Sequence, residues 1–231
     1  MLPPLILLHG ALGHPDQFRQ LELLLHTQFD IHTLCFRGHG PQALSPQGIP
    51  VEELVQQVAD YVKENELNQL TIFGYSLGGY VALLYAHQEP DRVKSVLTLA
   101  TKMSWSAAIA AQERKLLIPE QIIKKIPAYA EQLARWHGQH KWKQLVLSTG
   151  DMMQRLGAFP LLQEAQLKAI ANPVQMMVGD QDKMVSITET LEATQLIPGA
   201  SFAVLPSSKH PFEQVRLALL HSLMQDFWKN K

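Results

Sequence analysis

A serine, an aspartate and a histidine occupy positions from which they could form a nucleophile and its base. Ser76 lies at the centre of Gly-Tyr-Ser-Leu-Gly, residues 74–78, which fits the pattern G-x-S-x-G. This pattern is typical of a sharp strand-to-helix turn that exposes a nucleophilic serine. A serine hydroxyl is a weak nucleophile until an oriented base takes its proton. The motif therefore predicts acyl-transfer chemistry, such as ester hydrolysis.

The glycines around Ser76 have a steric explanation. When a chain turns from strand to helix within a few residues, the positions two before and two after the serine come close together. Gly74 and Gly78 are small enough to fit there, and Gly79 lets the following helix approach the sheet. The turn also places the hydroxyl at a helix N-terminus, where free amides favour negative charge.

The base and its acid are predicted in the loops that follow two later apolar runs. His210, in the polar loop 206–211, is the candidate base, and it would later donate the proton to the leaving group. Asp180 and Asp182 both follow the run 174–178, and either could orient the imidazole. We favour Asp182, which lies further into the loop, because Asp180 directly follows the strand and could simply cap the turn.

Two backbone amides are needed to bind the oxyanion of the tetrahedral intermediate. One should belong to Leu77, the residue after the nucleophile. The other should come from the loop after the first apolar run, where Ala11 follows the flexible Gly10. The neighbouring His9 is expected to make a structural hydrogen bond at the strand end. No HExxH pattern or Cys/His cluster suggests a metal site, and the chemistry requires no metal or organic cofactor.

The elements that must position these residues alternate along most of the chain. Short apolar runs, which read as strands buried on both faces of a sheet, occur at residues 5–8, 31–36, 70–73, 93–99, 174–178 and 202–205. Helical spacing follows at residues 16–26, 51–64, 77–87, 187–196 and 211–228. This order predicts an α/β fold, in which helices flank a mostly parallel sheet.

The alternation stops between residues 103 and 172, where no convincing strand appears. Prolines and glycines punctuate helical patterns there, and a long unstructured loop would be improbable in a compact domain. We therefore predict a core domain of residues 1–102 and 173–231, interrupted by a helical cap, or lid, of residues 103–172 with three to five helices.

Composition argues against several other function classes. The 231 residues suit one domain with an insertion, and the formal charge of −1 gives no reason to expect nucleic acid or a membrane as a partner. The N-terminus lacks the features of a signal peptide, and the single cysteine, Cys35, cannot form an internal disulfide. We expect a cytoplasmic protein acting on a small molecule; the oligomeric state is left open.

Together, these motifs resemble the α/β-hydrolase superfamily over nearly the whole chain. Residues 9–10 (HG), 36–40 (FRGHG), 74–79 (GYSLGG), 179–182 (GDQD) and the histidine at 210 follow the family's order. The resemblance implies a helical cap after the sixth family strand and a sheet trimmed to about six strands, because the usual first two look absent. Within the superfamily the chain is similar to small capped bacterial serine esterases, the carboxylesterase of biotin synthesis and the synthase of menaquinone synthesis.

Two positions depart from these relatives. The menaquinone enzymes carry an arginine where this chain has Tyr80, which disfavours a dicarboxylate substrate. Cys35 stands where the family often has an aspartate, and a buried strand thiol is expected there rather than a nucleophile. Family dehalogenases and epoxide hydrolases use an aspartate nucleophile, so Ser76 disfavours both.

The leading prediction is a serine hydrolase of a carboxylic ester or thioester with an apolar acyl or aryl group. The alternatives are a carbon–carbon bond hydrolase or elimination enzyme with the same triad, and a non-enzymatic binding protein on this fold. Aromatic, histidine and methionine side chains of the cap could line an apolar pocket, although most would more simply form the cap's core: Met103, Trp105, Trp136, His137, Trp142, Met152, Met153 and Phe159.

Overall fold

The computed structural model describes residues 2–230 and contains a six-stranded sheet in which neighbouring strands all run parallel. The strands are β1 (Pro4–Leu8), β2 (Asp30–Leu34), β3 (Leu70–Tyr75), β4 (Val93–Leu99), β5 (Val174–Gly179) and β6 (Ser201–Leu205). Their order across the sheet is β2-β1-β3-β4-β5-β6. Each strand overlaps one of the predicted apolar runs, so the predicted fold class is confirmed.

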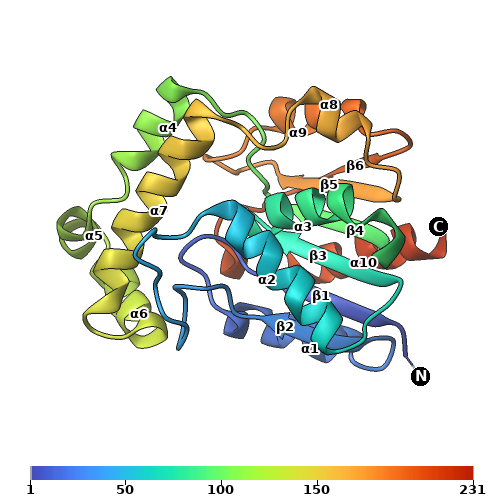
Figure 1. Cartoon of the computed structure of the whole chain (residues 1–231), viewed down its shortest axis with the longest axis horizontal. Helices are drawn as coiled ribbons and strands as arrows, with labels where there is room; N and C mark the ends of the chain where they lie inside the picture. The colour runs from blue at the N-terminus through green and yellow to red at the C-terminus, as the bar shows by residue number, and fades with distance from the viewer. Residues whose placement is uncertain (1, 231) are drawn as a thin grey trace.

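Alternate residues of the inner strands β1, β3, β4 and β5 pack against opposite layers of helices. Ile6 and Leu8 of β1 belong to the core on one face, and Leu5 and Leu7 belong to the core on the other. The first face is covered by α2 (Val51–Glu64), α3 (Leu77–Gln88) and α9 (Ile187–Leu196), and the second by α1 (Arg19–Leu25) and α10 (Leu217–Lys229). Figure 1 shows α2 and α3 in front of the sheet and α1 and α10 behind it. Burial on both faces explains the continuous apolar runs.

The last helix starts later than its sequence pattern predicts. The spacing predicts helix from residue 211, whereas the chain first makes a 3-10 turn at Phe212–Gln214 and α10 begins at Leu217. The ring of Phe212 packs edge-on against Phe18 at 5.1 Å, and the Arg216 backbone N–H donates to the Ser208 hydroxyl. These contacts divert the chain from a continuous helix and anchor the loop that carries His210.

Five helices lie between β4 and β5, at the upper end of the predicted number. They are α4 (Ala107–Arg114), α5 (Pro119–Lys125), α6 (Pro127–His137), α7 (Lys141–Ala158) and α8 (Glu164–Lys168). In Figure 1, α4 to α7 form a group beyond one end of the strands, whereas α8 lies beside α9. The Tyr80 hydroxyl of α3 accepts the N–H groups of Leu161 and Leu162 at 3.0 and 2.9 Å, which ties the segment after α7 to the helices of the sheet.

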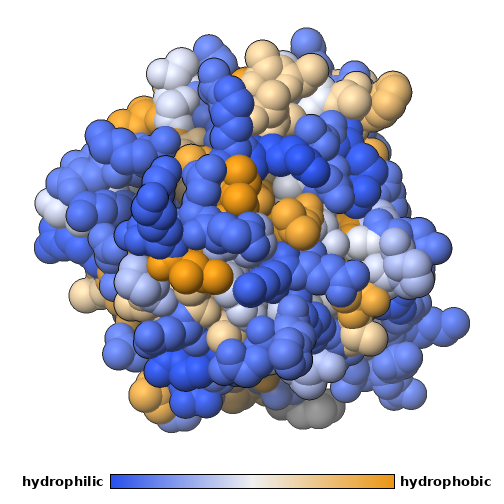
Figure 2. All heavy atoms as spheres, turned by 90° about the vertical axis from the view of Figure 1, so that its left-hand side faces the viewer, coloured by the Kyte–Doolittle hydropathy of each residue, from blue (hydrophilic) through white to orange (hydrophobic). Residues whose placement is uncertain are grey.

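The outer face of this helical group is mostly polar. Figure 2 views that end of the molecule and shows apolar side chains as separate islands among hydrophilic ones. The large apolar side chains exposed on these helices and their connections are Leu116, Ile123, Ile126, Leu147 and Phe159. In the described part of the chain, no helix combines the length and apolar character that crossing a membrane requires.

Candidate active site

The turn between β3 and α3 has the strained geometry that its glycines predict. Ser76 adopts φ 52° and ψ −116°, a region that residues other than glycine rarely enter. A Cβ atom at Gly78 would collide with the Leu8 carbonyl, and one at Gly74 would collide with the Gly78 carbonyl. The Ser76 backbone N–H donates to the Leu99 carbonyl at 2.8 Å, so β4 holds the strained residue in place.

The loop after β6 brings His210 to Ser76. The Nε2 atom of His210 lies 3.3 Å from the Ser76 hydroxyl, and its Nδ1 atom lies 2.8 Å from Oδ2 of Asp182. The Tyr75 hydroxyl donates to the His210 carbonyl at 2.8 Å and so fixes the backbone of this loop. Three side chains that are far apart in the sequence therefore form one chain of contacts at the carboxyl ends of the strands, the edge at which open α/β sheets bind ligands.

The two candidate aspartates occupy different environments. The side chain of Asp182 is fully buried, and its Oδ1 accepts two backbone N–H groups of the next turn at 2.8 and 2.9 Å, which leaves Oδ2 for His210. Asp180 instead accepts the Ser208 backbone N–H at 3.3 Å. Asp182 is thus placed to orient the imidazole, whereas Asp180 braces the connection between two loops.

Both predicted oxyanion donors border the cavity above Ser76. Among residues 2–230, neither the Ala11 nor the Leu77 N–H has a hydrogen-bond partner. His9 donates from Nδ1 to the Gly10 carbonyl at 2.8 Å, which confirms its predicted structural hydrogen bond. Because a trans peptide is planar, with its C=O and N–H pointing in opposite directions, this bond turns the Ala11 N–H away from His9.

Two further buried histidines fix the next residue of this loop. Leu12 has a φ of 58°; its N–H donates to Nε2 of His39, and its carbonyl accepts from Nε2 of His137, both at 3.1 Å. Nδ1 of His137 accepts the Gly40 N–H at 2.9 Å, and Nδ1 of His39 donates to the Arg37 carbonyl at 3.1 Å. Each ring thus uses one nitrogen as acceptor and the other as donor to backbone groups, which only a neutral imidazole can do. His137, on α6, packs in this network and does not line the cavity.

Burial lowers the pKa of these histidines. The pKa of His9 falls to about 3 and that of His137 to about 4, in both cases mainly because burial disfavours the charged ring. Its hydrogen bond to the Leu12 carbonyl raises the pKa of His137, whereas protonation of the neighbouring His14 and the charge of Lys141 lower it. Burial likewise holds the pKa of His39 well below 6.5. The loop that carries Ala11 is therefore held by imidazoles that remain neutral at physiological pH.

This network predicts a loss of stability in mild acid. An unfolded histidine binds a proton below its ordinary pKa of 6.5, whereas folded His137 resists protonation until about pH 4. Its contribution is complete above pH 6.5 and is lost as the pH falls towards 4. In His137→Gln, the slope of the unfolding free energy against pH in this interval should decrease by about 1.4 kcal/mol per pH unit.

Urea unfolding at graded pH measures this slope. His26→Gln is the matched control, because His26 is exposed and should leave the slope unchanged. An unaltered slope in His137→Gln would contradict the assignment of a neutral buried imidazole.

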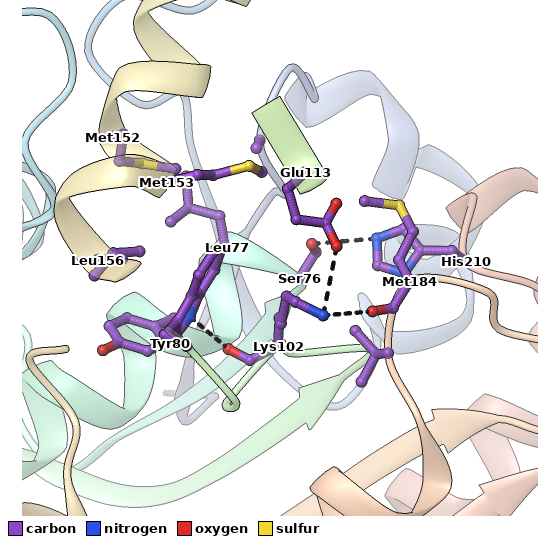
Figure 3. Close-up of a pocket in the computed structure, with 13 residues that line it drawn as sticks. Ser76, Leu77, Tyr80, Lys102, Glu113, Met152, Met153, Leu156, Met184 and His210 are labelled. Atoms are coloured by element: carbon purple, nitrogen blue, oxygen red, sulfur yellow. Dashed lines mark hydrogen bonds and ion pairs between the residues drawn. The ribbon is translucent and has the colours of Figure 1, made fainter. Parts of the chain in front are cut away.

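A cavity lies over Ser76. Its volume is about 440 Å³, which includes the space open to solvent at its mouth. Figure 3 shows Met152, Met153 and Leu156 of α7 on one side of the cavity and Met184 and His210 on the other. Of the eight aromatic, histidine and methionine side chains that the sequence suggested for the pocket, three line the cavity: Trp105, Met152 and Met153. Met103, Trp142 and His137 are buried elsewhere, Trp136 stacks on His14 with ring centroids 5.7 Å apart, and Phe159 is 79% exposed.

The lining also contains two charged residues that the sequence analysis did not select, Lys102 and Glu113. Lys102 follows the end of β4, so its place at the ligand-binding edge of the sheet could have signalled it. Glu113 lies on α4, and no local signal shows which face of this helix meets the cavity.

The cysteine is not arranged as a nucleophile. Cys35 is free and half-buried, and burial raises the pKa of its thiol to about 11. It therefore remains a neutral thiol at physiological pH. Among residues 2–230, no three side chains of His, Cys, Asp or Glu are grouped as metal ligands.

Known proteins share this sequence pattern and this architecture. Residues 3–146 match the family model described as alpha/beta hydrolase fold. A probable alcohol acetyltransferase of Cyberlindnera fabianii is 33% identical over 94 residues, which cover 40% of this chain and 25% of that protein. The chain thus spans about a quarter of the length of this relative.

Two other similarities extend over most of the chain. The pimeloyl-acyl-carrier-protein methyl ester esterase of Chromobacterium violaceum is 25% identical over 235 aligned residues, which cover 91% of this chain and 88% of that enzyme. The structure of NosK from Streptomyces actuosus superposes with a TM-score of 0.84 at 20% identity and covers 100% of this chain and 99% of that one. At that identity, the superposition establishes the fold.

Proposed function

The chain belongs to the α/β-hydrolase fold family, and on this premise we propose that it is a serine hydrolase that cleaves a carboxylic ester or thioester through an acyl-enzyme. The observation that carries the proposal is the continuous contact from Asp182 through His210 to Ser76, at 2.8 and 3.3 Å. A relative that aligns over most of the chain is named an esterase, which supports the same reaction class.

In the proposed mechanism, the Ser76 hydroxyl oxygen attacks the carbonyl carbon while its proton passes to Nε2 of His210. Asp182 keeps Nδ1 of His210 protonated and stabilises the imidazolium that forms. The oxyanion accepts hydrogen bonds from the backbone N–H groups of Ala11 and Leu77. His210 then protonates the leaving group. Water, deprotonated by the same imidazole, releases the acid from the serine.

We propose that residues 103–172 act as a cap that shapes the acyl or aryl pocket over a core of residues 1–102 and 173–231. The methionines of α7 and Trp105 give this part of the cavity an adaptable apolar surface. The contact of His137 with the Leu12 carbonyl couples the position of α6 to the loop that carries Ala11. A shift of the cap would therefore also move Ala11, one of the proposed oxyanion donors.

A substrate panel tests the reaction class. Nitrophenyl esters of increasing chain length, acyl-CoA thioesters and an aryl dienone acid are offered to the wild-type protein, and product release is followed spectroscopically. We expect turnover of esters or thioesters, with the rate rising with apolar chain length until the cavity is filled. Cleavage confined to the dienone acid would instead favour carbon–carbon chemistry. Absence of turnover and of fluorophosphonate labelling would favour a binding protein.

A further inference from the structure

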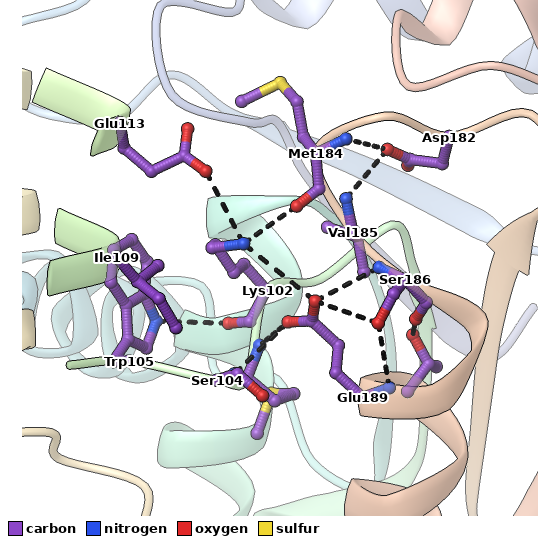
Figure 4. Close-up of polar contacts among 12 residues, drawn as sticks. Lys102, Ser104, Trp105, Ile109, Glu113, Asp182, Met184, Val185, Ser186 and Glu189 are labelled. Atoms are coloured by element: carbon purple, nitrogen blue, oxygen red, sulfur yellow. Dashed lines mark hydrogen bonds and ion pairs between the residues drawn. The ribbon is translucent and has the colours of Figure 1, made fainter. Parts of the chain in front are cut away.

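A charged cluster borders the cavity above Ser76, and two of its members, Lys102 and Glu113, belong to the otherwise mostly apolar lining. Lys102 donates from Nζ to the Met184 carbonyl at 2.8 Å, and lies 3.5 Å from Oε1 of Glu113 and 3.9 Å from Oε2 of Glu189 (Figure 4). The exposed fractions of the Lys102, Glu113 and Glu189 side chains are only 16%, 13% and 10%, respectively. Because desolvating charged groups is costly, such a cluster calls for a structural or functional reason.

Glu189 has a structural reason. Its Oε1 accepts the backbone N–H groups of Met103 and Ser104 at 3.1 and 3.2 Å, and its Oε2 accepts that of Ser186 at 3.1 Å. It thereby completes the capping box of α9 and fixes the chain after β4. Its oxygen atoms are already occupied by the protein's own backbone.

Glu113 has no such set of partners. Its contact with Lys102 at 3.5 Å is longer than a normal hydrogen bond, and among residues 2–230 its carboxylate accepts no hydrogen bond. Figure 3 shows this carboxylate pointing from α4 into the pocket, on the side where Ser76 and His210 lie. A largely buried carboxylate with free acceptor positions therefore faces the space that a substrate would occupy.

The balance of charge around the cavity determines which ligand group would suit Glu113. Glu113 and Lys102 line the cavity, and two further carboxylates lie directly behind the lining: Glu189 beside Lys102 and Asp182 beside His210. The local balance is therefore three carboxylates to one ammonium. The other titratable residues in the lining are His210, whose Nε2 faces Ser76, and Tyr80, whose hydroxyl accepts the N–H groups of Leu161 and Leu162. A site with excess negative charge attracts a cationic group and repels an anionic one.

We propose that Glu113 forms a subsite for an ammonium group carried by the acyl part of the ester, with Lys102 as the positioning residue that holds its carboxylate in the cavity. This inference rests on the proposed function, because it names the substrate class of the same site. It also predicts discrimination against esters that carry a carboxylate, since their charge would oppose that of Glu113.

Paired substrates of equal shape test the subsite. Nitrophenyl esters of graded chain length that end in a trimethylammonium group are compared with esters ending in the neutral tert-butyl group and with esters ending in a carboxylate. In the wild-type protein, kcat/KM should be about tenfold higher for the best cationic ester than for its neutral isostere, and lowest for the anionic ester. In Glu113→Gln, this cationic-to-neutral ratio should fall to about one. Glu120→Gln, an exposed carboxylate on α5, is the matched control and should keep the wild-type ratio.

A binding measurement separates failure of the subsite from failure of the proposed function. Calorimetry measures how non-hydrolysable amides of the same cationic and neutral acids bind to Ser76→Ala and to Ser76→Ala/Glu113→Gln. Preferential binding of the cationic amide that depends on Glu113, without any ester turnover by the wild-type protein, would retain the subsite and reject the hydrolase. Turnover with equal rates for the cationic and neutral esters would reject the subsite and retain the hydrolase. A preference for the anionic ester that disappears in Lys102→Met would also overturn the proposal, because Lys102 would then be the recognising charge.

Discussion

In Ser76→Ala, we expect ester turnover to fall by about 10⁶-fold in kcat, to the level left by substrate binding and the oxyanion donors. The substitution removes the oxygen that attacks the carbonyl, so no acyl-enzyme can form. The alanine side chain should be accommodated without rearrangement, with position 76 keeping the strained φ of 52°. Nitrophenolate release at saturating ester concentration measures the effect.

Ser222→Ala is the matched control for this experiment. Ser222 is exposed on α10 and donates within its own helix to the Ala218 carbonyl, so its loss should leave kcat unchanged. Turnover by Ser76→Ala within tenfold of the wild-type rate would mean that another group is the nucleophile.

In Asp182→Asn, we expect kcat to fall by about 10⁴-fold with little change in the fold. Two backbone N–H groups donate to Oδ1 of Asp182, so they will hold the amide oxygen of the asparagine at this position. The amide NH₂ group would then face Nδ1 of His210. That nitrogen would become the acceptor, the proton would move to Nε2, and the imidazole could no longer take the proton of Ser76.

Asp180→Asn provides the comparison for this prediction. Its amide oxygen can still accept the Ser208 backbone N–H, so kcat should stay within a few-fold of the wild-type value. Initial rates of the two variants, measured with the same ester, decide between the carboxylates. A larger loss in Asp180→Asn than in Asp182→Asn would contradict the geometry.

Local sequence signals were sufficient for most of the sheet. Runs such as β1 and β5 are largely apolar because helices cover both faces, and this property is visible without knowledge of the neighbours. The start of α10 was predicted wrongly because the helical spacing continues through residues 211–216, while contacts with Phe18 and Ser208 fold that stretch differently. Those partners lie elsewhere in the chain or in a preceding loop, so periodicity alone cannot reveal them.

The same distinction applies to the residues of the candidate site: local sequence identifies some of them, whereas the roles of others depend on tertiary contacts. Ser76 and His210 could be selected because the glycine pattern and the order along the chain restrict the choice. The spacing of Asp180 and Asp182 could not show which side chain faces the imidazole, because two residues in one loop differ only in direction. Glu113 borders the cavity and His137 contacts the loop that carries Ala11, both from helices between β4 and β5, and their roles depend on how those helices pack against the sheet.

The most direct test of the central claim is to locate the covalent adduct. The protein is treated with a fluorophosphonate, digested, and analysed by mass spectrometry, alongside Ser76→Ala and His210→Gln. We expect one phosphonyl adduct on the peptide containing Ser76, none in Ser76→Ala, and much slower labelling in His210→Gln, because the hydroxyl then lacks its base. Labelling of a different residue, or equally fast labelling of Ser76 without His210, would contradict the account.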